Sequence, residues 1–152
     1  MKINGMFSVF ALLILTAIGA GAADLVNKSF FGNLAVDGYD VVAYFTEGKP
    51  VKGTKEFMVE HNGAVYRFAS DEHRALFEKD PGKYLPAYGG FCAWAVAEGG
   101  TAGIDPEAWT IFQDRLYLNY NKKVQATWEK DKAGNIARAD AKWPGIVEAK
   151  TK

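Results

Sequence analysis

The chain contains one cysteine and two histidines, and these three side chains could together hold a metal ion. Cys92 lies in the glycine-rich stretch YGGFCAWAVAEGG, His61 precedes an Asn-Gly pair, and His73 lies in the segment DEHRALFEKD. Thiolates favour soft Cu(I), whereas imidazoles suit Cu(II) and zinc. Cys92 with one or both histidines would therefore form an open, mixed nitrogen–sulfur site of two or three ligands that could exchange metal.

Each of the three residues also has a purely structural interpretation. A lone cysteine cannot form a disulfide within the chain. Cys92 is therefore a buried inert thiol, a metal ligand, a reactive thiol, or a residue bonded to another molecule. The flanking glycines and a short helix start would favour its thiolate form. His73, on the first turn of a helix, could be a solvated surface residue, and His61, at a hairpin end, could keep one ring nitrogen in water.

The other polar candidates, Tyr39, Asp40 and Tyr44, lie in the segment GYDVVAY. Asp40 is interpreted as a turn or capping residue rather than a catalytic one. The sequence has no G-x-S-x-G, H-E-x-x-H or C-x-x-C motif and no phosphate-binding loop. We therefore assign no catalytic residue, and the sequence favours a binding protein over an enzyme.

Residues 1–22 have the pattern of a secretory signal peptide. Lys2 supplies a positive charge, the run MFSVFALLILTAIGA is apolar and uncharged, and small residues fit a cleavage site before Ala23 or Asp24. The run is short for a membrane span of about 20 residues, and an uncleaved anchor is the alternative. We expect a periplasmic or secreted protein with no stable membrane span after cleavage.

The composition of the remaining residues, 23–152, is typical of a single folded domain. Hydrophobic residues make up 49% of the chain, which argues against disorder. The 18 basic and 18 acidic residues balance, and removing the signal peptide takes away only Lys2, which leaves a net charge of −1. Since no basic stripe is present, nucleic acid is excluded as the expected partner. No feature identifies a protein partner.

Turn signals predict two hairpins. Segments EFMVEH and AVYRFA flank Asn62-Gly63, which predicts a type I′ turn that pairs residue 59 with 66 and residue 57 with 68. In the second hairpin the turn is expected at residues 113–115. Four apolar residues would then share one face: Trp109, Ile111, Leu116 and Leu118.

The remaining segments predict one strand and several helices. The apolar run VVAYF, residues 41–45, is predicted to be a strand. Ser70 is expected to cap a helix over residues 71–80, one or two helical turns should follow Cys92, and the C-terminal region should form one or two helices with a break near Gly134. The order of elements indicates an α+β fold of small antiparallel hairpins packed with short helices.

A series of motifs resembles the small exported proteins that carry a YHS domain. The series is DGYDVVAYF, HNGAVYRFAS, LFEKDPGKY and YGGFCAWAV, and the resemblance extends from Gly32 to Trp143. It implies a YHS-type domain with a C-terminal helical extension. It also implies metal binding, because YHS domains are similar to the heavy-metal-binding domains called TRASH and occur attached to copper-transporting ATPases.

The departures from the cysteine-rich relatives change the ligands that the resemblance implies. Those relatives have Phe-Cys-Ser-x-x-Cys at the helix start, where this chain has Ala69 and His73 at the two cysteine positions. A site made only of cysteines is therefore excluded. In the exported subgroup the position of Cys92 is sometimes selenocysteine, which implies redox or soft-metal chemistry there.

These observations predict an exported metal-binding module, with copper as the expected metal and Cys92, His73 and His61 as its ligands. Two alternatives stay open. One is a thiol-dependent redox protein that uses Cys92 with an outside thiol, since the chain offers no second cysteine. The other is an interaction module that binds no small ligand.

Overall fold

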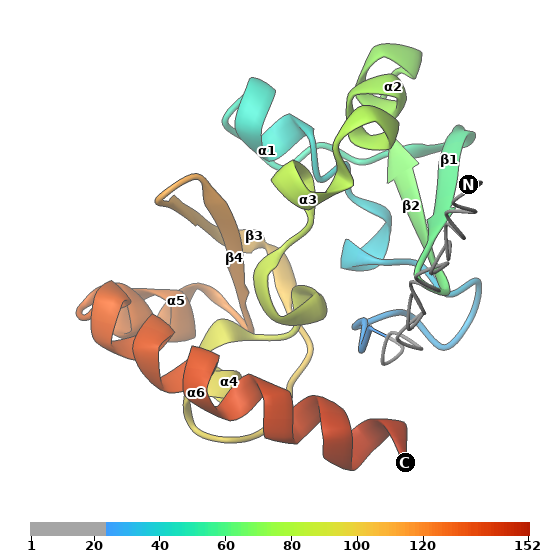
Figure 1. Ribbon diagram of the computed structural model, residues 1–152. Helices are drawn as coiled ribbons and strands as arrows, with labels where there is room; N and C mark the ends of the chain where they lie inside the picture. The colour runs from blue at the N-terminus through green and yellow to red at the C-terminus, as the bar shows by residue number, and fades with distance from the viewer. Residues whose placement is uncertain (1–23) are drawn as a thin grey trace, which may run out of the picture.

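Two antiparallel hairpins and a set of helices build residues 24–152, the part of the chain that the computed structural model describes (Figure 1). This is the α+β fold class that the sequence predicts. The predicted signal peptide, residues 1–22, lies outside the described residues. In chain order the elements are η1 (Val36–Gly38), α1 (Ala43–Thr46), β1 (Thr54–His61), β2 (Ala64–Phe68), α2 (Asp71–Lys79), α3 (Pro81–Tyr84), η2 (Ala87–Gly90), α4 (Ala93–Ala97), β3 (Asp105–Phe112), β4 (Arg115–Asn119), α5 (Lys122–Glu129) and α6 (Lys132–Thr151).

The first hairpin, β1–β2, has the predicted turn. Asn62 and Gly63 both have positive φ, 50° and 72°, as a type I′ turn requires. Val59 pairs with Tyr66 as predicted, but the predicted pairing of residue 57 with 68 is wrong. The register shifts between Thr54 and Met58, so that Phe68 pairs with Thr54 instead. Extra residues in β1 are therefore left outside the ladder, which sequence alternation alone does not reveal.

The segment 41–45 is not the predicted strand, because it enters helix α1. Asp40 Oδ1 accepts hydrogen bonds from the backbone N–H groups of Val42 at 2.9 Å and Ala43 at 3.2 Å. These two bonds satisfy donors at the start of the helix, so the chain turns immediately after Asp40. Val41 and Val42 are still fully buried in the core. A short apolar run can be buried either as a strand or as a helix, so its burial alone does not predict which of the two it forms.

The second hairpin, β3–β4, keeps the predicted face but has a shorter turn. Trp109 pairs with Leu118 and Ile111 with Leu116. The turn contains only Gln113 and Asp114, both with positive φ, and Arg115 already belongs to β4. All four apolar partners pack in or against the same hydrophobic cluster.

Two hydrophobic clusters divide the core. The first lies around β1, β2, α1 and α2 and includes Tyr66, Phe68 and Phe77. The second lies around α4 and α6 and includes Tyr88 and Trp128. Helix α6 runs along the second cluster to the C-terminus, and α1 and α2 lie at the opposite end of the molecule (Figure 1). The chain passes from the first cluster to the second between Leu85, which packs against the first, and Ala87 of η2, which belongs to the second.

The C-terminal region forms two helices, as the sequence allows, but the break is earlier than predicted. Helix α5 ends at Glu129 and α6 begins at Lys132, so Gly134 lies in the first turn of α6. Asp131 caps this helix, since its Oδ1 accepts the N–H of Gly134 at 3.0 Å. Within residues 24–152, no helix combines the length and the apolar character that a membrane crossing needs.

Candidate functional site

Three side chains from separate segments form a hydrogen-bonded row at the start of α2. His73 Nδ1 lies 2.6 Å from Asp40 Oδ2, and His73 Nε2 lies 3.2 Å from Thr46 Oγ1. Asp40 precedes α1, Thr46 ends α1, and His73 lies on the first turn of α2. Ser70 caps α2 as predicted, and its Oγ accepts the N–H of His73 at 3.1 Å. The Ser70 cap therefore fixes the position of the His73 imidazole relative to α1.

The Asp40 carboxylate is fully buried and accepts several hydrogen bonds. Its exposed fraction is 0%, and it accepts the N–H groups of Val42, Ala43 and Ala69 in addition to the imidazole. The predicted role of Asp40 as a turn or capping residue is confirmed. A carboxylate surrounded by N–H donors acts as an acceptor, so Nδ1 of His73 carries the proton that it donates.

This arrangement leaves the second ring nitrogen of His73, Nε2, beside Thr46. In the neutral ring, Nε2 then carries a lone pair, and the side chain of His73 keeps 13% of its surface exposed. Thr46 has one hydroxyl proton and two acceptors in reach, Val42 O at 3.2 Å and His73 Nε2 at 3.2 Å. When that proton goes to Val42, Nε2 is available to another partner. A carboxylate-oriented imidazole suits metal ligation, and it also suits proton transfer.

Cys92 is buried and lies directly before the short helix α4. Its exposed fraction is 1%, and its Sγ donates to Asn119 Oδ1 at 3.5 Å. The same amide oxygen accepts the N–H of Trp94 at 3.1 Å, so Asn119 holds the start of α4. The predicted helical turn after Cys92 is confirmed. A thiol with these contacts behaves as a small packed residue with a weak donor.

His61 packs against aromatic rings of the first cluster. Its ring centroid lies 5.6 Å from that of Phe77 and 6.3 Å from that of Tyr66, edge to face in both cases. It ends β1, in the same row as Val59, as the hairpin predicts. The ring is partly buried, so it contributes apolar contact as well as polar atoms.

The three predicted ligands therefore have different partners. Among residues 24–152, no three side chains of histidine, cysteine, aspartate or glutamate come together into a group that could hold one metal ion. His73 has Asp40 and Thr46, Cys92 has Asn119, and His61 has aromatic rings. Their use as metal ligands stays a prediction.

The sequence reasoning missed the pairing of Asp40 with His73. The capping role of Asp40 follows from its local segment, but His73 lies 33 residues further along the chain. The only signal was the position of His73 itself, at the start of a helix where relatives with cysteines have a ligand. Nothing in the sequence pointed to Thr46.

Residues 42–88 match the family model of the YHS domain, so the chain contains a YHS domain. The matched range includes His73, Thr46 and His61, and it ends before Cys92. No curated protein and no solved structure matches the chain. The match supports the part of the sequence resemblance that concerns the YHS domain.

Proposed function

We propose that this YHS domain-containing protein is an exported metal-binding module, with copper as its metal and His73 as the first ligand. The observation that supports this most directly is the 2.6 Å hydrogen bond from His73 Nδ1 to the buried carboxylate of Asp40. Metal-binding histidines regularly donate their second N–H to a carboxylate, which fixes the tautomer and orients the ring. The other ring nitrogen, Nε2, which lies 3.2 Å from Thr46 Oγ1, would bind the metal.

Copper is the ion that a site with few protein ligands would favour. For a given set of nitrogen and oxygen donors, Cu²⁺ binds more tightly than the other divalent ions of the first row, including Zn²⁺. An imidazole with Thr46 beside it leaves most coordination positions to water or to a second molecule. Such a site would exchange its ion readily, as suits a module that passes metal to a partner.

Cys92 and His61 are proposed as further ligands only with rearrangement. The thiol has an exposed fraction of 1% and donates to Asn119, so metal access would require α4 to move. The redox alternative meets the same barrier, because a thiol must reach its oxidant or partner thiol. Cys92 is therefore the member of the predicted set whose contribution is expected to be smallest in the folded protein.

Replacing His73 by glutamine should weaken copper binding. We expect the affinity for Cu²⁺, measured by calorimetry with glycine as competitor, to fall by at least about tenfold, since a direct ligand is lost. Electron paramagnetic resonance should lose the nitrogen hyperfine lines of a bound imidazole. The matched control is His61→Gln, and Cys92→Ser tests the thiol with both Cu²⁺ and Cu⁺. Equal affinities in the wild-type protein and the His73 variant would contradict the role of His73.

Export predicts a shortened chain in the cell. Mass spectrometry of the protein from the periplasm or the medium should find an N-terminus at Ala23 or Asp24, because the small residues before them fit the cleavage site. Placing a charge in the apolar run with Leu13→Arg should leave the intact chain inside the cell. An unprocessed chain in the wild type would instead support the uncleaved anchor.

A further inference from the structure

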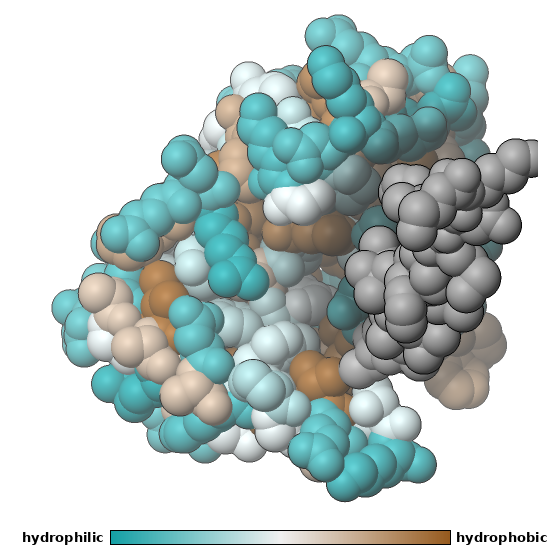
Figure 2. All heavy atoms as spheres, viewed as in Figure 1, coloured by the Kyte–Doolittle hydropathy of each residue, from teal (hydrophilic) through white to brown (hydrophobic). Residues whose placement is uncertain are grey.

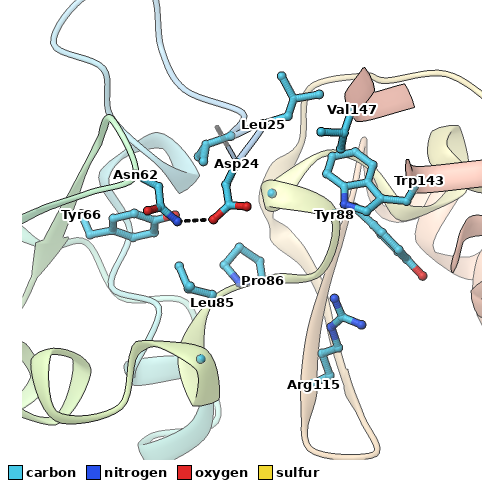
Figure 3. Close-up of a pocket in the computed structure, with 13 residues that line it drawn as sticks. Asp24, Leu25, Asn62, Tyr66, Leu85, Pro86, Tyr88, Arg115, Trp143 and Val147 are labelled. Carbon is cyan, nitrogen blue, oxygen red and sulfur yellow. Dashed lines mark hydrogen bonds between the residues drawn. The ribbon is translucent and has the colours of Figure 1, made fainter. Parts of the chain in front are cut away.

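We propose that the protein has a second ligand site, a cavity of about 350 Å³ that binds a small aromatic carboxylate with Arg115 as its charged anchor. The cavity contains none of the residues of the candidate metal site. Its lining residues come from segments that are far apart along the chain, and Figure 3 shows them facing one another. The lining residues that matter here are Asp24, Asn62, Tyr66, Tyr88, Arg115 and Trp143.

The cavity lies where the two hydrophobic clusters meet. Tyr66 and Leu85 belong to the first cluster or pack against it, and Tyr88 and Trp143 do so in the second. In Figure 2, brown apolar surface lies near the middle of the drawn face, below the teal surface around α2. Small-molecule sites are mostly apolar with few polar groups, and this lining has that character. A volume of about 350 Å³ is at the lower end for ligand pockets, which indicates a ligand of one or two rings.

One wall of the cavity is built from strained backbone. Tyr88 has φ of 57°, in the left-handed region that bulky residues rarely adopt, and Gly89 follows with φ of 59°. Tyr88 is nevertheless held firmly, because its hydroxyl donates to Asp140 at 2.9 Å and its ring packs 5.8 Å from that of Trp143. Strained residues that the surroundings hold in place concentrate at ligand sites.

The N-terminal segment closes another side. Asn27 donates its backbone N–H to Gly89 O at 2.9 Å and its side chain to Gly90 O at 3.1 Å. These bonds hold the N-terminal segment against the turn that contains Gly89. Asp24 and Leu25 therefore line the cavity. The opening is therefore shaped by contacts between segments more than 60 residues apart along the chain.

Arg115 supplies the positive charge. Its guanidinium lies 5.6 Å from the centre of the Tyr88 ring and 5.9 Å from that of Tyr117. Among the ion pairs of residues 24–152, none involves Arg115. Burial raises the pKa of Tyr88 and, with the nearby charge of Asp24, raises that of Tyr66 to about 12, so both phenols stay neutral. The guanidinium is thus the positively charged side chain among the described lining residues, and its planar fork matches a carboxylate.

The end of the cavity opposite Arg115 contains hydrogen-bond acceptors. Asp24 Oδ2 accepts the side-chain N–H of Asn62 at 2.5 Å, and Figure 3 shows this pair across the cavity from Arg115. A carboxylate there repels a second acid group and accepts from a hydroxyl. The aromatic lining between the two ends suits a flat ring. The arrangement therefore favours a monocarboxylic aromatic acid with a hydroxyl at its far end.

The test uses 4-hydroxybenzoate as the probe and nuclear magnetic resonance of the purified protein as the readout. We expect a saturable shift of the indole N–H signal of Trp143 at concentrations up to about 10 mM. The neutral analogue 4-hydroxybenzamide and the variant Arg115→Gln should each weaken binding by at least about tenfold. Arg115→Lys should restore part of it, and Arg138→Gln is the control, since Arg138 does not line the cavity.

Two results would overturn the proposal. One is the absence of a saturable Trp143 shift in a wild-type protein that is folded by its thermal melting curve. The other is equal affinity for the acid and the amide, or for the wild type and Arg115→Gln. Because His73→Gln leaves the lining unchanged, it should bind the probe normally, so this site and the proposed copper site can fail independently.

Discussion

Replacing Asp40 by asparagine should lower the free energy of unfolding by about 3 kcal/mol, because the partly buried N–H of Ala69 loses its acceptor and His73 loses the charged group to which it donates. The amide oxygen can still accept from Val42 and Ala43, but the amide NH₂ would face the N–H of Ala69. His73 could bond to that NH₂ only by moving its own proton from Nδ1 to Nε2. Each unsatisfied buried donor costs about 1–3 kcal/mol. Urea unfolding followed by tryptophan fluorescence measures the change.

The control for this change is Asp114→Asn, in the exposed turn of the second hairpin. Its left-handed backbone accepts asparagine, so the free energy of unfolding should change by no more than about 0.5 kcal/mol. In the folded Asp40 variant, copper affinity should also fall by about 10- to 100-fold, because His73 loses the group that orients it. A loss of stability below about 1 kcal/mol would show that the buried hydrogen bonds of Asp40 contribute little.

Replacing Phe77 by alanine should lower the free energy of unfolding by about 3–5 kcal/mol. Phe77 is fully buried, and its ring centre lies 5.1 Å from those of both Tyr66 and Phe68. The substitution would leave a cavity between α2 and the first hairpin. The surrounding side chains are closely packed and cannot move far enough to fill it. Since His73 lies one turn before Phe77 in α2, loosening this helix would also disturb the hydrogen bond to Asp40.

Two further variants test that explanation. Phe77→Leu keeps most of the apolar volume and should cost less than Phe77→Ala, whereas Phe31→Ala removes a ring that is 83% exposed and should change stability by no more than about 0.5 kcal/mol. Thermal or urea unfolding provides the comparison. Similar losses for the buried and the exposed phenylalanine would contradict the assignment of Phe77 to the core.

Local signals in the sequence predicted the elements whose geometry depends on neighbouring residues. The Asn62-Gly63 turn formed as expected, because only residues that tolerate positive φ close a type I′ hairpin. Ser70 caps α2 through a bond to a residue three positions later. The α+β class followed from the order of such segments. In each case the deciding interaction spans a few residues, so the sequence contains it directly.

Only the tertiary structure decided how the chemically capable residues are used. The run at residues 41–45 enters helix α1 instead of forming a strand because Asp40 bonds to the N–H groups of Val42 and Ala43, and the same carboxylate reaches His73 in α2. Cys92 is packed against Asn119 from β4, 27 residues away. These contacts join segments that are far apart along the chain. Periodicity and turn signals describe each segment by itself and do not predict which segments will meet. Their partners are selected by the way the elements pack, because a buried polar group must find its hydrogen bonds wherever the fold brings a donor or acceptor to it.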